Sequence, residues 1–182
     1  MDDSQIRIVE SYRDYRPPFD ASKLVRTLLN KVPDKYLRGL DCVVLVNTEG
    51  LSRKERLGKV RSRKRKIRQS HVAGYYHHAW QGRPPYIEIR LDKTLSNYPK
   101  RLLWIPFFRE LHVVNVLYHE LGHHIHNFVR PEYREKEDVA EDWRKKLMTN
   151  FLRKKYWWAI WPIVLYGKMR RMVSPPKARV AR

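Results

Sequence analysis

The sequence predicts an α+β fold, in which an N-terminal helix precedes a small mixed sheet with an edge strand and two longer helices follow that sheet. Three patterns predict it. Apolar residues recur with helical spacing from Leu24 to Leu29, a β-branched run covers Cys42 to Val46, and apolar and polar residues alternate from Tyr86 to Leu91. Helical spacing is typical of an amphipathic helix, and strict alternation is typical of a half-buried strand.

The first helix is predicted from Lys23 to Leu29. Asp20-Ala21-Ser22 precedes it and supplies a candidate N-cap, because a side-chain oxygen there can accept a hydrogen bond from the first turn. Pro33 ends the segment. The run from Cys42 to Val46 is followed by Asn47-Thr48-Glu49-Gly50, so it is interpreted as a buried strand that ends in a turn.

Two more strands are predicted, from His71 to Ala79 and from Tyr86 to Leu91, and the segment 81–85 joins them as a turn. In the second strand the polar side chains of Glu88 and Arg90 alternate with isoleucines. Such alternation indicates one face in the core and one face in solvent. The strand 86–91 is therefore interpreted as a half-buried edge strand.

The two helices after the sheet are predicted at 111–127, which is mostly apolar, and at about 132–151. Pro131 separates them. The second helix has one apolar stripe, formed by Ala140, Trp143, Leu147 and Phe151.

Length and composition predict three parts: an N-terminal segment 1–19, one domain over 20–152 and a basic aromatic segment with a tail over 153–182. A single cysteine, Cys42, excludes an intrachain disulfide and a zinc cluster of thiolates. The acidic start, Met1-Asp2-Asp3, has neither the basic nor the apolar region of a secretory signal. A cytoplasmic location is therefore expected.

The net charge of +20 is unevenly distributed along the chain. Residues 51–104 hold 15 Lys and Arg against 3 acidic residues, and residues 143–182 hold 12 against none. Ten of these basic residues lie in 53–68, which has too little apolar content to bury itself and is predicted to be an exposed loop or hairpin arm. The distribution predicts a polyanionic partner, either nucleic acid or an anionic membrane surface.

An aromatic and aliphatic block extends from Tyr156 to Tyr166 between basic clusters. As a helix its residues would rise only about 16 Å, roughly half of a bilayer core, and Pro162 interrupts it. The block is therefore not expected to span a membrane. It either lies at a lipid headgroup boundary or packs on the domain.

The chemistry-bearing motif is His119-Glu120-Leu121-Gly122-His123. Histidines four residues apart on a helix project from one face and can bind one zinc ion. Glu120 lies beside them, where its carboxylate can take a proton from a zinc-bound water. Gly122 would let a neighbouring element approach the helix closely. The candidate cofactor is Zn²⁺, held by nitrogen and oxygen ligands.

The third protein ligand is expected to be a carboxylate, because no histidine follows His126. His126 is too far along the helix from His119 to share its ion, and His124 points about 100° away from His123, so both are interpreted as bystanders. If the two helices fold back antiparallel, Glu137 is level with His123 and Glu141 is level with His119. Glu137 is then the predicted ligand.

Glu141 would orient His119 through the ring nitrogen that does not face the metal. A looser corner between the helices would instead make Glu141 or Asp142 the ligand.

This pattern resembles the zincin metallopeptidases of the gluzincin type, in which a His-Glu-x-x-His helix is followed by a glutamate helix. Glu137-Asp138-Val139-Ala140-Glu141 looks like the Glu-x-x-x-Asp/Glu element of that family. The order of elements over 20–152 is similar to the minigluzincins and the ImmA/IrrE-like proteins, and the region of Gly74 and Tyr75 is similar to SprT-like proteases. SprT-like proteases use a third histidine, which is lacking here. The extended metzincin pattern is excluded, since it requires Gly and His where this chain has His126 and Val129.

The resemblance implies zinc-dependent hydrolysis of peptide bonds, with Glu120 as the base and with Tyr133 or the tyrosines 75–76 as candidates for stabilising the oxyanion. A peptide substrate is expected to lie extended along strand 86–91. The alternative function is a non-catalytic, metal-stabilised protein that binds nucleic acid or an anionic membrane through 53–68 and 153–171.

Overall fold

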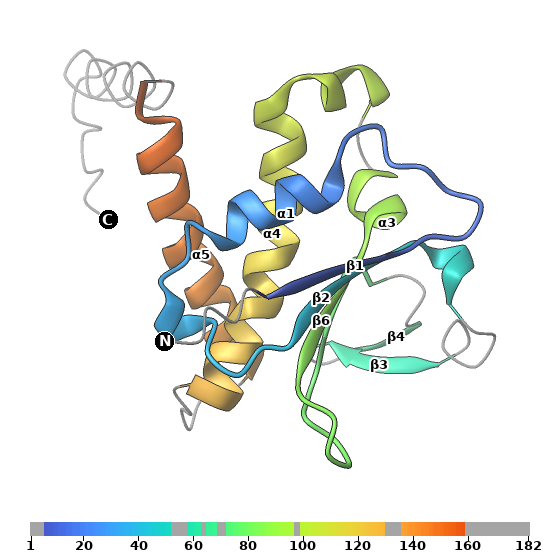
Figure 1. Cartoon of the computed structure of the whole chain (residues 1–182), viewed down its shortest axis with the longest axis vertical. Coiled ribbons are helices and arrows are strands. Elements are labelled where there is room, and N and C mark those ends of the chain that lie inside the picture. Colours follow the sequence, from blue (N-terminus) through green and yellow to red (C-terminus); the bar gives the residue numbers. More distant parts are fainter. Residues whose placement is uncertain are drawn as a thin grey trace, which may run out of the picture. The chain divides into compact units, whose positions relative to one another are not determined.

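The computed structural model describes residues 6–51, 58–62, 65–68, 72–96, 99–129 and 136–158 of the 182-residue chain. The chain divides into two units, residues 1–148 and residues 149–182. The first unit is a mixed α+β fold, as the sequence predicts (Figure 1).

The main sheet has four strands in the order β1-β2-β6-β5. They are β1 (Arg7–Ser11), β2 (Cys42–Val46), β5 (Gly74–His77) and β6 (Tyr86–Arg90). The strands β1 and β6 run parallel to β2, whereas β5 runs antiparallel to β6, so the sheet is mixed. The prediction that strand 86–91 is an edge strand is wrong, because β6 pairs with β2 on one side and with β5 on the other. The edge strand beside β6 is β5.

Strand β1 was not predicted from the sequence. Four of its five residues are exposed, so it lacks the apolar period that indicates a strand. Its position comes from backbone pairing with β2, whose Val43 and Leu45 are fully buried. The turn between β5 and β6 is tight, with Gln81 and Gly82 at positive φ angles of 48° and 77°.

The described residues form four α-helices: α1 (Ala21–Leu29), α3 (Leu91–Ser96), α4 (Pro106–His124) and α5 (Lys136–Lys155). The Asp20 side chain accepts a hydrogen bond from the Lys23 backbone, as expected for the N-cap of α1. Leu91 begins α3, so the strand predicted at 86–91 ends one residue earlier. After α4 the chain continues as a π-helical turn, Ile125–Val129.

Helices α1 and α4 lie along the same side of the sheet (Figure 1). Fully buried side chains from both helices and from the facing strands form the core there. The Tyr118 hydroxyl of α4 donates a hydrogen bond to the Leu28 carbonyl of α1, which joins the two helices. This packing fixes α4, which carries His119, Glu120 and His123, against the sheet.

The basic segment contains a separate two-stranded ribbon, formed by β3 (Lys59–Ser62) and antiparallel β4 (Arg65–Arg68). The predicted arm at 53–68 is therefore a hairpin over its described part, and residues 53–57 and 63–64 lie outside the described residues.

In the second unit the structure describes residues 149–158. The Tyr156 ring packs edge-on against Phe151, whereas Trp157 and Trp158 are exposed. Most of the predicted 156–166 block lies outside the described residues. Among the helices of the described residues, none has the length and apolar character needed to cross a membrane.

Helix α5 crosses α4 at Gly122. A β-carbon at this position would lie 2.6 Å from the carbonyl oxygen and 2.8 Å from the Cα of Ala140. Such distances are far below van der Waals contact, so only glycine allows the two backbones to come this close. The close approach predicted for Gly122 is confirmed, and the neighbouring element is α5.

Gly122→Ala is expected to destabilise the fold, although alanine is about 1 kcal/mol better than glycine inside an ordinary helix. The added methyl group would overpack the contact with Ala140, which costs about 1–3 kcal/mol or more. Urea denaturation measures the change. Thr149→Ala, at an exposed position of α5, is the control and should stay within about 0.5 kcal/mol of the native protein. A Gly122→Ala variant more stable than the native protein would contradict the close contact.

Candidate metal centre

His119 and His123 lie one turn apart on α4, with their ring centroids 4.9 Å from each other and their planes nearly perpendicular. Both side chains are half-buried. The helical spacing of four residues brings the two rings to one face, as the sequence predicts. Both therefore remain accessible to a small ion.

Glu137, near the start of α5, joins the two histidines. One ligand atom from each of His119, His123 and Glu137 lies within 4.8 Å of the others, and His119 Nε2 is 3.6 Å from Glu137 Oε2. The ligand atoms of tetrahedral zinc stand about 3.3 Å apart, given bonds of about 2.0–2.1 Å. Two nitrogens and one carboxylate oxygen are also zinc's usual donors outside thiolate sites. The three residues therefore fit a metal with only small adjustments.

Glu141, one turn further along α5, approaches the other nitrogen of the same ring. Its Oε2 lies 3.9 Å from His119 Nδ1. The Arg144 guanidinium holds this carboxylate, donating from Nε to Oε2 at 2.8 Å and from its terminal nitrogen to Oε1 at 2.5 Å. Arg144 also lowers the pKa of Glu141, which therefore stays ionised at neutral pH.

Glu120 lies against strand β5 and close enough to the cluster that the charges of His119 and Glu137 act on its carboxylate. Only 7% of it is exposed. A β-carbon on Gly74 would lie 2.8 Å from the Glu120 side chain, so a glycine on β5 leaves room for this carboxylate. The backbone N–H of Tyr76 donates a hydrogen bond to it. Glu120 is thus held between α4 and the edge strand.

The pairing of β5 with β6 explains why the Tyr76 N–H can reach Glu120. The Arg90 N–H donates to the Ala73 carbonyl at 2.8 Å, which makes this a hydrogen-bonded pair. Such pairs alternate along an antiparallel ladder, so the backbone groups of Gly74 and Tyr76 face outward from β6. The outward edge of β5 therefore lies beside Glu120.

Burial and neighbouring charges shift the pKa values of His119, Glu120 and His123 in different directions. Burial raises the pKa of Glu120 to about 7, although the charge on His119 acts in the opposite direction. Burial lowers the pKa of His123 to about 4, and His119 acts in the same direction. Burial also favours neutral His119, but the carboxylates of Glu137, Glu120 and Glu141 outweigh it and raise its pKa. His123 is therefore neutral at pH 7 and keeps a lone pair for a metal.

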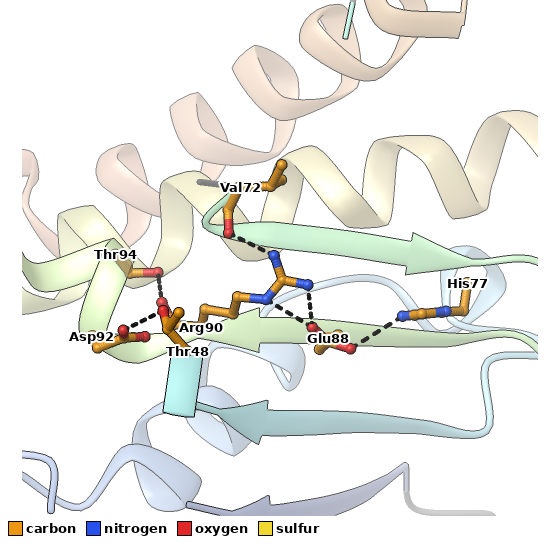
Figure 2. A network of polar contacts seen from close by, with 7 residues as sticks. All are labelled: Thr48, Val72, His77, Glu88, Arg90, Asp92 and Thr94. Carbon is orange, nitrogen blue, oxygen red and sulfur yellow. Dashed lines mark hydrogen bonds and ion pairs between the residues drawn. The ribbon is translucent and has the colours of Figure 1, made fainter. Parts of the chain in front are cut away.

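A buried polar network on β6 holds the start of β5 (Figure 2). The Arg90 guanidinium donates to Glu88 Oε1 at 2.9 and 2.6 Å and to the Val72 carbonyl at 3.1 Å. The other Glu88 oxygen lies 3.2 Å from His77 Nε2. Arg90 is fully buried and Glu88 is 6% exposed, so the prediction that these residues face solvent is wrong. Their charges compensate each other, which makes burial tolerable.

His124, the last residue of α4, and His126 in the π-helical turn are both buried. His124 Nδ1 lies 3.3 Å from the Tyr76 hydroxyl and its Nε2 lies 3.1 Å from the Arg38 carbonyl, so this ring joins the helix to β5 and to the loop before β2. His126 is buried as well. Neither belongs to the three-residue cluster identified among the described residues.

The candidates for stabilising an oxyanion are only partly described. Tyr133 lies outside the described residues. The Tyr76 hydroxyl is hydrogen-bonded to His124 Nδ1, and the Tyr75 ring packs edge-on against His77. Asp142, an alternative third ligand, is exposed and is not part of the cluster.

Sequence reasoning missed the contacts of Gly74 and the Tyr76 backbone with Glu120, and it gave no role to Arg144. A glycine in a strand signals a close approach, and an arginine three residues after a glutamate on a helix signals a pair. The glycine signal does not identify Glu120, which lies on a distant element, and the arginine signal identifies Glu141 but not the second contact of Arg144 with Asn115 on α4.

Comparison with known proteins identifies no family for this chain, since no protein-family model, no curated protein and no solved structure matches it. The chemistry of the site therefore follows from its own residues and distances.

Glu137→Ala is expected to release zinc, because it removes one of the three clustered donors. Glu141→Ala should weaken zinc binding by about 10–100-fold without abolishing it, as loss of an outer partner does. Asp138→Ala, which changes the exposed neighbouring acid, is the control and should bind zinc normally. Zinc per chain after equilibrium dialysis is the measurement. An empty site in Glu141→Ala together with a full site in Glu137→Ala would reverse the assignment.

Proposed function

We propose that this chain is a zinc-dependent metallopeptidase of the gluzincin type, with a zincin-like fold. The observation that carries the proposal is the convergence of His119, His123 and Glu137 within 4.8 Å, with Glu120 next to them in the chain and against β5. Three protein donors leave a fourth position open, which distinguishes catalytic zinc sites from structural ones. When bound, zinc would lower the pKa of a coordinated water to near 7 and polarise a substrate carbonyl.

Glu120 acts as general base and then as general acid. It is buried and its carboxylate is held beside the edge strand, so it can take a proton from the attacking water and pass it to the leaving amine. His119 and His123 serve as ligands, and Glu141 orients His119.

The substrate is an extended peptide that adds to the sheet at β5. The predicted docking along strand 86–91 is wrong, because both sides of β6 are paired. The outward backbone groups of β5 lie beside Glu120, so a peptide paired there would present its main chain to the catalytic residues. Since Glu120 already accepts from the Tyr76 N–H, the Tyr76 carbonyl and the backbone of Gly74 are the groups for this pairing.

Glu120→Gln is expected to keep zinc and lose peptide hydrolysis by about 10²–10⁴-fold, because the amide cannot accept the proton. Zinc content and cleavage of an unstructured protein substrate are measured on the same preparation. His119→Ala is the matched variant and should lose both zinc and activity. Equal loss of zinc in the two variants would contradict the assignment of Glu120 as base.

The alternative function, a non-catalytic metal-stabilised protein, makes a different prediction. Under this alternative, a chelator would lower the unfolding temperature of the protein, and no peptidase activity would be measured with or without the chelator. Under the proposed function the chelator abolishes a measurable peptidase activity, and added zinc restores it.

The β3–β4 ribbon supports a second proposal, that the chain binds duplex nucleic acid. The register places Lys59 opposite Arg68 and Arg61 opposite Lys66. Residues of a strand alternate between faces, so these four basic positions share one face of the ribbon. Like charges directly opposite each other destabilise a strand pair, and an anionic partner would relieve that repulsion.

The composition of the ribbon favours a duplex over other polyanions. The segment 53–68 contains no aromatic residue, so it offers no ring to stack on unpaired bases or to lie at a lipid headgroup boundary. A two-stranded ribbon fits the major groove of B-DNA, where basic side chains reach phosphates on both strands.

Arg61→Gln with Lys66→Gln is expected to weaken duplex binding and to reduce the slope of log affinity against log salt by about 1.8, which is the effect of two phosphate contacts. Lys31→Gln with Lys35→Gln removes the same charge from exposed positions elsewhere and is the control. Fluorescence anisotropy over a salt series measures both. Equal loss in the two double variants, or binding to anionic vesicles without binding to DNA, would contradict the proposal.

A further inference from the structure

Two carboxylates of α5 approach different nitrogens of one histidine at the candidate centre. Glu137 lies 3.6 Å from Nε2 of His119, and Glu141 lies 3.9 Å from Nδ1 of the same ring. The side chains of both acids are 24% exposed, so burial does not distinguish them. Something else must decide which acid binds the metal and which acid orients the histidine.

We propose that Arg144 makes this decision, because it holds Glu141 in the orienting position and keeps it from becoming a metal ligand. The inference rests on the proposed metal site and names a positioning residue for it. Both oxygens of Glu141 accept hydrogen bonds from the Arg144 guanidinium, at 2.8 and 2.5 Å. Paired bonds of this kind between a planar guanidinium and a carboxylate are strong and fix the relative orientation of the two groups.

Asn115 anchors the guanidinium on the helix that carries the histidines. The third guanidinium nitrogen of Arg144 donates to Asn115 Oδ1, a side chain of α4. The rigid guanidinium therefore spans α5 and α4 and sets where Glu141 stands relative to His119. A lysine at this position could supply the charge but not three bonds in one plane.

The consequence is a chain of contacts in which Asn115 binds Arg144, Arg144 binds Glu141, and Glu141 lies beside His119. With its proton on Nδ1, His119 would donate toward Glu141, which leaves the lone pair on Nε2, the nitrogen beside Glu137, for the metal. With Glu141 held back, the site keeps three protein donors and an open fourth position.

Lys145 provides a matched control within the same cluster. Its Nζ lies 3.8 Å from Glu141 Oε1, but its side chain is 62% exposed and makes a single contact with this acid. It therefore adds a screened positive charge beside Glu141 without fixing the carboxylate.

Zinc affinity, measured by competition with a chromophoric chelator, tests the proposal. Arg144→Gln is expected to weaken binding by about tenfold, the lower end of the effect of losing an outer partner. Arg144→Lys should fall between Arg144→Gln and the native protein, and Lys145→Gln should stay within about twofold of the native protein. The absorption spectrum of bound Co²⁺ should change in Arg144→Gln and not in Lys145→Gln, because only the first alters the geometry around the metal.

A double-mutant cycle separates positioning from general stability. In a Glu141→Gln background, Arg144→Gln should change zinc affinity by less than about twofold, because Arg144 acts through Glu141. An equal loss in both backgrounds would overturn the proposal, as would unchanged affinity in Arg144→Gln alone. Urea unfolding of the metal-free variants identifies any loss that comes from the fold. A native protein that binds no zinc would instead overturn the proposed function, and this inference with it.

Discussion

The close approach of α5 to α4 is the constraint on which the candidate centre depends. Gly122 lets the two backbones touch at Ala140, and Arg144 joins the helices again at Asn115. Along α4 these two ties are seven residues, or about 10 Å, apart, and His119 lies between them. Two contacts on either side of the histidine prevent α5 from pivoting about one point. The carboxylates of α5 are therefore set relative to the imidazoles by the packing of the backbone.

The position of β5 depends on the buried ion pair of Glu88 and Arg90 on the neighbouring strand β6. A buried pair such as Glu88 and Arg90 contributes little net stability, because desolvation offsets most of its attraction. What it provides here is specificity, since Arg90 also donates to the carbonyl of Val72, two residues before β5. The strand is then held where Gly74 and the Tyr76 backbone meet Glu120. An apolar pair would fill the same space without selecting this register.

The centre is acidic within a strongly basic chain. A net charge of +20 would repel a divalent cation at long range, but that field is screened over about 8–10 Å in physiological salt. Within this distance Glu120, Glu137 and Glu141 surround the two histidines. Arg144 contributes a partly buried positive charge there, and it is paired with Glu141. The local field at the centre thus favours a cation, in spite of the positive net charge of the chain.

What the sequence determined by itself is local: the spacing of His119, Glu120 and His123 on one helix, the N-cap of α1 and the buried strand β2. These features depend on residues within one or two turns, so helical and strand periods are sufficient to predict them. Tertiary structure alone decided that β5 and not β6 is the edge, that Glu88 and Arg90 are buried, and that Arg144 reaches from α5 to Asn115 on α4. Those outcomes depend on which backbones meet, and a pairing between distant segments leaves no period in the sequence.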